Sequence, residues 1–195
     1  MKKVLSALLS AVLLFTAVGF TSCAKKDQDP VTVTMVVKDY GTVEIELYPD
    51  KAPKTVENFL SLVNDGFYDG LTFHRVVANL IVQGGDPTGT GYGDPSLKRI
   101  PGEFKSNGFT KNTLKHERGT ISMARSDDPD SATSQFFICS RAYPSWDGNY
   151  AAFGKVVKGI EIIDEMTSVP CDAYSRPLTP LVIETIRVAP TDTEK

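Results

Sequence analysis

The sequence predicts a mainly β fold, a β-barrel capped by helices. Most apolar runs are short and alternate with polar or small residues, which is the period of a half-buried strand. Only two stretches repeat their apolar residues at helical spacing, and turn-forming residues separate the runs. A chain of 195 residues is long enough for one domain with a substantial hydrophobic core.

The first elements are a hairpin and a helix. Residues 31–37 and 43–47 alternate in polarity on either side of a turn that ends at Gly41, so they predict a β-hairpin. Pro53 stands where a helix can begin, because proline lacks an amide hydrogen that the first helical turn does not use. Apolar residues follow it at helical spacing, and Gly66 provides a C-terminal stop.

The rest of the chain predicts six more strands and one short helix. A stretch rich in turn-forming residues, 84–113, separates the earlier strands from the later ones. The expected strands are residues 71–77, 80–83, 119–124, 134–140, 153–157 and 181–188, and the second helix has Ile160, Ile163 and Met166 on one face.

Residues 1–22 have the features of a secretory signal peptide. Lys2 and Lys3 precede an apolar run, residues 4–20, and small residues follow that run. The run is at the lower limit of membrane-spanning length and contains hydroxyl side chains, so a retained transmembrane anchor is the alternative interpretation.

Residues 20–23 (Phe-Thr-Ser-Cys) resemble a bacterial lipobox, in which the cysteine is acylated and becomes the first residue of a lipoprotein. Phe20 stands where that pattern prefers leucine, and a plain signal peptide is the alternative. We therefore expect residues 23–30 to be a lipidated Cys23, with chains such as palmitate, and a polar tether to the membrane. Ala24 is not the aspartate that retains enterobacterial lipoproteins at the inner membrane. The expected location is the periplasmic side of the outer membrane of the cell envelope, and a secreted, soluble periplasmic protein is the alternative.

Charge and ligand content argue against several classes of function. Without residues 1–22 the chain has 19 basic and 24 acidic residues, a net charge of −5, which argues against a nucleic-acid partner. His74 and His116 are the only histidines, and no His/Cys spacing fits a metal site. Cys139 is expected to be a buried thiol, while a disulfide with Cys171 stays open. A hydrolase built from His74, a serine and an aspartate has no local sequence support.

Arg75 and Gln83 interrupt apolar runs that otherwise resemble buried strands. A buried charge without a partner is costly, so a chain that keeps one in such a run usually uses it. Because alternate residues of a strand share a face, we expect Phe73, Arg75 and Val77 on one side of their strand.

Three ordered motifs resemble those of the cyclophilins, the cyclosporin-type peptidyl-prolyl cis–trans isomerases. They are residues 73–91 (FHRVVANLIVQGGDPTGTG), 119–124 (GTISMA) and 134–139 (SQFFIC). The resemblance extends from residue 31 to residue 188, within an expected domain of residues 31–190 that is followed by a polar tail, 191–195. It implies a closed eight-stranded antiparallel β-barrel with a helix at each end. It also implies a monomeric isomerase, without metal or cofactor, that binds proline-containing segments of unfolded or partly folded proteins.

The resemblance also implies roles for individual residues. Arg75 would be the catalytic hydrogen-bond donor, and Gln83 would help to hold the substrate carbonyl and the arginine. His74 and His116 are expected to make structural hydrogen bonds. The implied substrate-binding residues are Leu80, Ile81 and Phe137 in a proline pocket, Trp146 and Tyr150 at its wall, Ala124, Arg125, Ser126 and Gln135 in a groove for the residues before proline, and Phe73 and Phe136.

The sequence departs from the family pattern at several of these positions. Leu80 stands where phenylalanine is common and Ile81 where methionine is, so the pocket stays apolar. Tyr150 replaces a frequent histidine, and Arg125 replaces a common asparagine. Trp146 lies one position beyond the tryptophan of cyclosporin-sensitive members, so we expect weak inhibition by cyclosporin. The alternative to an enzyme is a peptide-binding or chaperone module with the same fold.

Overall fold

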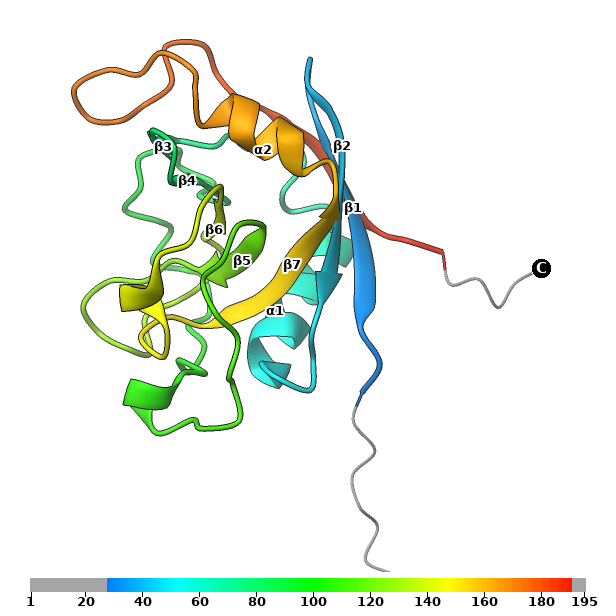
Figure 1. Ribbon diagram of the computed structural model, residues 1–195, viewed down its shortest axis with the longest axis vertical. Helices are drawn as coiled ribbons and strands as arrows, with labels where there is room; N and C mark the ends of the chain where they lie inside the picture. Colours follow the sequence, from blue (N-terminus) through cyan, green and yellow to red (C-terminus); the bar gives the residue numbers. More distant parts are fainter. Residues whose placement is uncertain (1–27, 191–195) are drawn as a thin grey trace, which may run out of the picture.

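The computed structural model describes residues 28–190, so the predictions for the signal peptide, Cys23, most of the tether and the polar tail lie outside the described residues. Within residues 28–190 the chain forms eight β-strands, two α-helices and two short 3₁₀ helices, which confirms the mainly β class (Figure 1). The strands are β1 (Val31–Val37), β2 (Gly41–Leu47), β3 (Arg75–Val77), β4 (Ile81–Gly84), β5 (Thr120–Met123), β6 (Phe136–Cys139), β7 (Ala152–Lys158) and β8 (Ile183–Val188). The helices are α1 (Pro53–Asn64), η1 (Lys105–Asn107), η2 (Pro144–Trp146) and α2 (Ile160–Met166).

The eight strands form one antiparallel sheet in the order β3-β4-β6-β5-β7-β2-β1-β8. The segments just before its two end strands, β3 and β8, meet at a single bridge between Thr72 and Val182. Beside this bridge the Phe73 N–H donates a hydrogen bond of 2.9 Å to the Leu181 carbonyl. The sheet is therefore a curled barrel whose last seam has one bridge rather than a ladder, and the prediction of a closed barrel is overstated.

Strand β3 is shorter than the strand predicted over residues 71–77. Phe73 and Val76 both lie in the main core, and a regular strand cannot point residues three apart to the same face. The chain is therefore irregular between them, and Phe73 does not share a face with Arg75, which is exposed. The expectation that they share a face is wrong because strand alternation does not hold across an irregular segment.

The two α-helices lie at opposite ends of the barrel (Figure 1). Helix α1 begins at Pro53, as predicted, and has no side-chain cap within its own segment. Instead, the buried Glu103 carboxylate accepts the backbone N–H of Lys54 at 3.0 Å and that of Thr55 at 2.8 Å. No helix in the described part of the chain has both the length and the apolar character needed to cross a membrane.

Two apolar clusters lie on opposite faces of strands β4 and β6. The main core fills the barrel and includes the aromatic residues Phe59 and Phe136, whose ring centroids are 5.6 Å apart. A smaller cluster of Ile81, Phe137 and Cys139 lies on the outer face. The neighbours Phe136 and Phe137 point to opposite faces because successive strand residues alternate. The outer cluster is the apolar floor on which the candidate site is built.

Candidate active site

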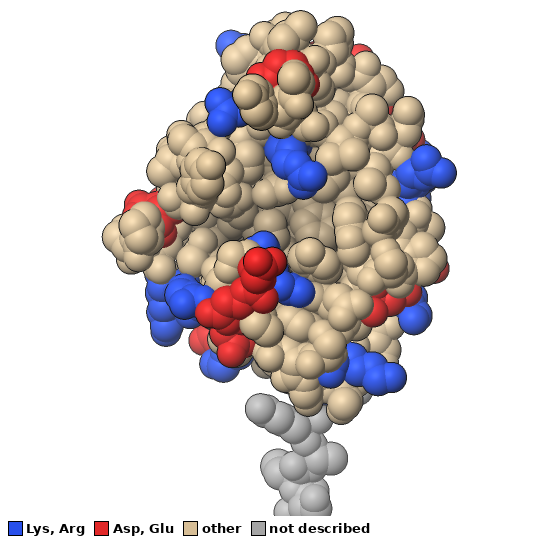
Figure 2. All heavy atoms as spheres, turned by 90° about the vertical axis from the view of Figure 1, so that its left-hand side faces the viewer, with Lys and Arg blue, Asp and Glu red and all other residues tan. Residues whose placement is uncertain are grey.

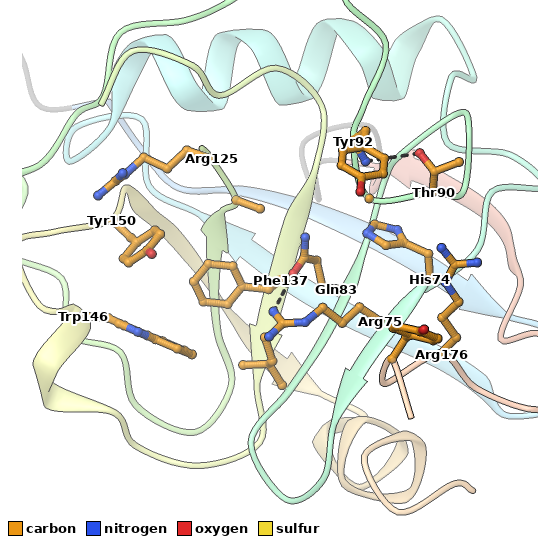
Figure 3. A pocket seen from close by; sticks show the side chains of 14 residues that line it. His74, Arg75, Gln83, Thr90, Tyr92, Arg125, Phe137, Trp146, Tyr150 and Arg176 are labelled. Atoms are coloured by element: carbon orange, nitrogen blue, oxygen red, sulfur yellow. Dashed lines mark hydrogen bonds between the residues drawn. The ribbon is translucent and has the colours of Figure 1, made fainter. Parts of the chain in front are cut away.

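A cavity of about 420 Å³ opens on the outer face of β3, β4 and β6. Figure 2, which faces the left-hand side of Figure 1, shows a hollow near the middle of that side, and Figure 3 shows the cavity from close by. Its lining residues come from strands β3, β4 and β6 and from the segments that connect the strands: His74, Arg75, Ile81, Gln83, Thr90, Gly91, Tyr92, Ala124, Arg125, Phe137, Trp146, Tyr150, Tyr174 and Arg176.

The register of three strands brings the central residues together. Arg75 of β3 lies opposite Gln83 of β4, and Gln83 lies opposite Phe137 of β6. Directly opposed residues in an antiparallel pair point to the same face, so these side chains form one row across the sheet. A second row two residues further along contains Ile81 opposite Cys139. Arginine, amide and apolar ring are therefore neighbours because of strand pairing, although Phe137 is far from the other two in sequence.

A chain of hydrogen bonds holds the arginine in place. The Arg75 Nη1 donates to Gln83 Oε1 at 3.1 Å, as drawn in Figure 3. The Gln83 Nε2 in turn donates to Gln135 Oε1 at 3.1 Å, and the Gln135 Nε2 donates to the Gly91 carbonyl at 3.2 Å. Arg75 is exposed, and its other N–H groups are available to a ligand in the cavity.

The apolar half of the cavity is built from aromatic rings around Phe137. The Phe137 ring contacts Trp146 at a centroid distance of 5.2 Å and Tyr150 at 5.9 Å, both in edge-to-face geometry. Ile81 lies beside it, and Cys139 is buried in the same cluster with a free thiol. Burial raises the pKa of that thiol to about 12, so Cys139 is uncharged and adds only packing.

Arg125 fixes the upper wall of the cavity. Its guanidinium lies 4.6 Å from the centroid of the Tyr150 ring and 5.2 Å from that of Phe104. Its Nη2 donates to the Asn149 carbonyl at 2.9 Å, and its Nη1 donates to the Ser126 carbonyl at 2.7 Å. The guanidinium thus joins three segments of chain, which is an arrangement that the asparagine common in the family is too short to make.

A buried Ser-His-Asp chain lies behind Phe137. The His116 Nε2 is 3.0 Å from Ser122 Oγ, and its Nδ1 is 3.2 Å from Asp147 Oδ1. These contacts confirm the expected structural role of His116. Ser122 has no exposed surface, so this arrangement cannot reach a substrate and does not make a hydrolase site. Burial lowers the pKa of His116, and the histidine is neutral at pH 7.

His74 differs from its prediction. It lies beside Arg75 in the cavity lining, it is buried, and neither ring nitrogen has a hydrogen-bond partner. The Gln135 amide is near enough to oppose the lowering of the His74 pKa, but its geometry is not that of a hydrogen bond. The expected structural hydrogen bonding of His74 is therefore wrong. Burial is the main cause that lowers its pKa, so the ring is neutral at pH 7.

The other predicted site residues lie in an adjoining groove, against the outer cluster or in the main core. Ser126 and Gln135 line an adjoining groove of about 630 Å³, together with Ala124 and Arg125. Leu80 packs against the outer cluster without lining the cavity.

The side chains of Phe73 and Phe136 lie in the main core, where their centroids are 6.0 Å apart, and not in the cavity. Their predicted contact with substrate is corrected for the side chains. Strand alternation on β6 turns Phe136 into the core, and the irregular segment before β3 turns Phe73 into the core, so the backbone and not the motif decides the face of each ring.

Besides His74, five lining residues were not predicted as site residues: Thr90, Gly91, Tyr92, Tyr174 and Arg176. They come from two turn-rich loops whose sequence has no period from which a direction could be inferred. The only local signal is the density of turn-forming residues around them, which is typical of binding loops as well as of plain connections.

Comparison with known proteins agrees with this geometry. The sequence model of the family described as "Cyclophilin type peptidyl-prolyl cis-trans isomerase/CLD" matches residues 32–188. The chain belongs to this family. It is 42% identical over 146 residues to a peptidyl-prolyl cis-trans isomerase of Schizosaccharomyces pombe, covering 73% of this chain and 90% of that protein. A peptidyl-prolyl cis-trans isomerase of Acinetobacter baylyi is 37% identical over 177 residues, covering 84% of this chain and 89% of that protein.

Solved cyclophilins have the same fold. A cyclophilin-type isomerase of Cryptosporidium parvum superposes with a TM-score of 0.75 and 32% identity, over 84% of this chain and 99% of the other. The structure of that protein in the presence of the dipeptide Ala-Pro gives a TM-score of 0.74 and 33% identity, over 82% of this chain and 99% of the other. Some relatives are much longer: the chain spans only 28% of an isomerase-like 2 protein of Rhizopus delemar, to which it is 40% identical over 156 residues, 78% of this chain.

Proposed function

We propose that this cyclophilin accelerates the cis–trans isomerisation of X-Pro bonds in unfolded or partly folded proteins, with Arg75 as the catalytic residue. The observation that supports this proposal is the row Arg75–Gln83–Phe137, which puts a hydrogen-bonded guanidinium beside an apolar pocket that can hold a proline ring. The Cryptosporidium parvum relative, whose structure was determined in the presence of the dipeptide Ala-Pro, supports proline-containing peptides as ligands.

The chemistry requires no bond to a nucleophile. Rotation about a peptide bond has a barrier of about 18–20 kcal/mol because it breaks amide resonance. In the twisted amide the nitrogen becomes pyramidal and has a lone pair that can accept a hydrogen bond. A guanidinium N–H placed at that nitrogen stabilises the twisted state more than the planar one, and this difference lowers the barrier. Gln83 keeps Arg75 in position, and the apolar pocket restrains the ring while the bond turns.

The test is cis–trans exchange in a short Ala-Pro peptide, followed by NMR exchange spectroscopy. Arg75→Ala is expected to lower kcat/KM by roughly 10²–10³-fold, the loss typical of one preorganised donor to a transition state. Arg187→Ala is the matched control, because this arginine lies on β8 and pairs with Asp69 outside the cavity. If Arg75→Ala kept full exchange activity, Arg75 would not be the catalytic residue. If the parent bound the peptide without accelerating exchange, the fold would serve as a peptide-binding module.

The cellular setting is part of the same proposal. We infer from the sequence of residues 1–23 that the mature protein is a lipoprotein that assists the folding of cell-envelope proteins. Mass spectrometry of the native N-terminus is expected to find Cys23 as an acylated first residue. An unmodified terminus further along the chain would instead indicate a soluble periplasmic protein. Weak inhibition by cyclosporin stays a prediction, and nanomolar inhibition would contradict it.

A further inference from the structure

The cavity has a polar half that the isomerase proposal does not use. Beyond Arg75 it is lined by His74, by Thr90 and Tyr92 from the loop after β4, and by Tyr174 and Arg176 from the loop between α2 and β8. In Figure 3 the Arg75 side chain extends toward Gln83 and Phe137, whereas Arg176 stands on the side of His74. The polar half therefore lies on the other side of Arg75 from the apolar pocket.

The loop that carries Arg176 is held against β3. The Val76 N–H donates to the Ser175 carbonyl at 2.8 Å, so the loop is attached one residue away from Arg75. Within the loop, Asp172 Oδ1 accepts the backbone N–H of Tyr174 at 2.8 Å and that of Arg176 at 2.9 Å. Tyr174 and Arg176, on either side of the attached residue, are thus presented to the cavity by an ordered turn.

The charged side chains that line this half of the cavity are basic, while the nearest carboxylates, Asp86 and Asp172, are held by backbone N–H groups of the two loops. None of the described residues that line the cavity is acidic, whereas the adjoining groove includes Asp94. The described part of the chain contains no ion pair of Arg176, while Arg125 is occupied by backbone carbonyls. Arg75 and Arg176 both line the cavity with His74. Burial is the main cause that lowers the pKa of His74; the Asp86 carboxylate opposes this lowering, and the charges of Arg75 and Arg176 add to it. Figure 2 shows basic and acidic side chains bordering the hollow.

Two exposed aromatic side chains flank the same half. Tyr92 is 96% exposed and Tyr174 is 82% exposed, the highest values among the large hydrophobic residues of the described chain. A tyrosine ring gives a large contact area at a low cost in conformational entropy, and its hydroxyl can donate a hydrogen bond. Tyr174 lines this cavity alone and is two residues from Arg176, whereas Tyr92 lines both this cavity and the adjoining groove.

We propose that this half is a subsite for a carboxylate side chain that follows the proline, so that the protein prefers X-Pro segments with an acidic residue one or two positions after proline. The direction follows from the two cavities. The residues before proline are expected in the groove of Ala124, Arg125, Ser126 and Gln135, and Arg176 lines the cavity but not that groove. Arg176 is the specificity-determining residue, because its guanidinium can bind a carboxylate through two parallel hydrogen bonds. The subsite rests on the proposed function for the placement of the proline.

The experiment compares acetylated, amidated peptides of sequence Ala-Ala-Pro-X-Ala, with X as Glu, Gln or Lys. The full-length protein is titrated with each peptide by NMR to obtain its Kd, and exchange rates are measured in the same samples. An exposed ion pair is worth about 0.2–1 kcal/mol, so the Glu peptide is expected to bind roughly 1.5- to 5-fold more tightly than the Gln peptide. The ratio is expected to approach one near 1 M salt, where the Debye length falls to about 3 Å.

Three variants decide the assignment. Arg176→Gln is expected to reduce the Glu-to-Gln preference to one, and Arg176→Glu to shift the preference to the Lys peptide. Arg187→Gln removes the same charge from β8 and is expected to leave the preference unchanged. A parent preference of one, or a preference that survives in Arg176→Gln, overturns the subsite.

A peptide with glutamate before proline distinguishes the direction. The proposal is also overturned if Arg176 acts on that peptide instead of on Ala-Ala-Pro-Glu-Ala. Binding and exchange separate the two proposals. Tight binding of the Glu peptide without exchange supports the subsite and contradicts the isomerase, whereas equal binding with rapid exchange does the reverse.

Discussion

Arg125→Ala tests whether the wall of the pocket depends on one guanidinium. In the structure this side chain is half-buried between the rings of Phe104 and Tyr150 and donates to the carbonyls of Ser126 and Asn149. The alanine variant keeps the Tyr150 contacts with Phe137 and loses every contact of the guanidinium. The connection between η2 and β7 then loses the side-chain hydrogen bonds of Arg125 to the Asn149 carbonyl and keeps the backbone hydrogen bond from the Met123 N–H to the Ala151 carbonyl.

The magnitude follows from these contacts. Each cation–π contact at a partly exposed site is worth about 0.5–1 kcal/mol, and a net hydrogen bond about 0.5–1.5 kcal/mol. With solvent replacing part of what is lost, we expect a decrease of about 2 kcal/mol in the free energy of unfolding. In a domain of this size 1 kcal/mol corresponds to roughly 2–4 °C, so Tm is expected to fall by about 4–8 °C. Peptide affinity is expected to fall several-fold, because the wall behind the proline becomes mobile.

Thermal unfolding and NMR titration with an Ala-Pro peptide measure the two effects. Arg125→Lys keeps the charge but has neither the planar fork nor the stacking surface, so it is expected to lose most of the same stability. Arg187→Ala is the control for loss of an exposed arginine, since Arg187 pairs with Asp69 outside the cavity and the adjoining groove. A Tm within 1 °C of the parent in Arg125→Ala, or full recovery in Arg125→Lys, would refute the reasoning that geometry at Arg125 supports the wall.

Two further predictions concern stability. Glu103→Ala leaves the first turn of α1 without its buried acceptor, and we expect the free energy of unfolding to fall by about 2–4 kcal/mol, because a cap and a hydrogen bond to a charged group disappear together. Urea unfolding measures this loss, with Glu117→Ala at the surface as the control. A change below 1 kcal/mol would contradict the prediction. The lowered pKa values of His74 and His116 make stability depend on pH: above their ordinary pKa of 6.5 both are neutral in either state, and below it the unfolded chain takes up protons that the folded protein resists. Tm is therefore expected to be constant from pH 8 to pH 7 and to fall as the pH drops from 6.5 through the folded pKa values, with a smaller fall in His74→Gln; a Tm that stays flat down to pH 5 would be the contrary result.

Much of the fold was predictable because the signals are local. The hairpin β1–β2 follows from strict alternation around one turn, and Pro53 begins α1 where its missing N–H does no harm. The motif around Arg75 and Gln83 indicates the centre of the site on its own, because a charge in an apolar run is unusual. Each of these signals depends on residues that are close in sequence, so it can be recognised without information about distant contacts.

Tertiary structure decided the rest, because which face a residue takes and which strand it lies against depend on pairing. Phe73 and Phe136 belong to the site motifs, yet their rings fill the barrel, and only the register places Phe137 beside Gln83. Arg176 reaches the cavity because an irregular loop is hydrogen-bonded to β3, a contact between residues about a hundred positions apart. The sequence by itself thus determined the family, the strands and the central arginine. Strand register and the docking of loops decided which residues face the pocket and which residues form its polar half, and no local period in the sequence encodes either.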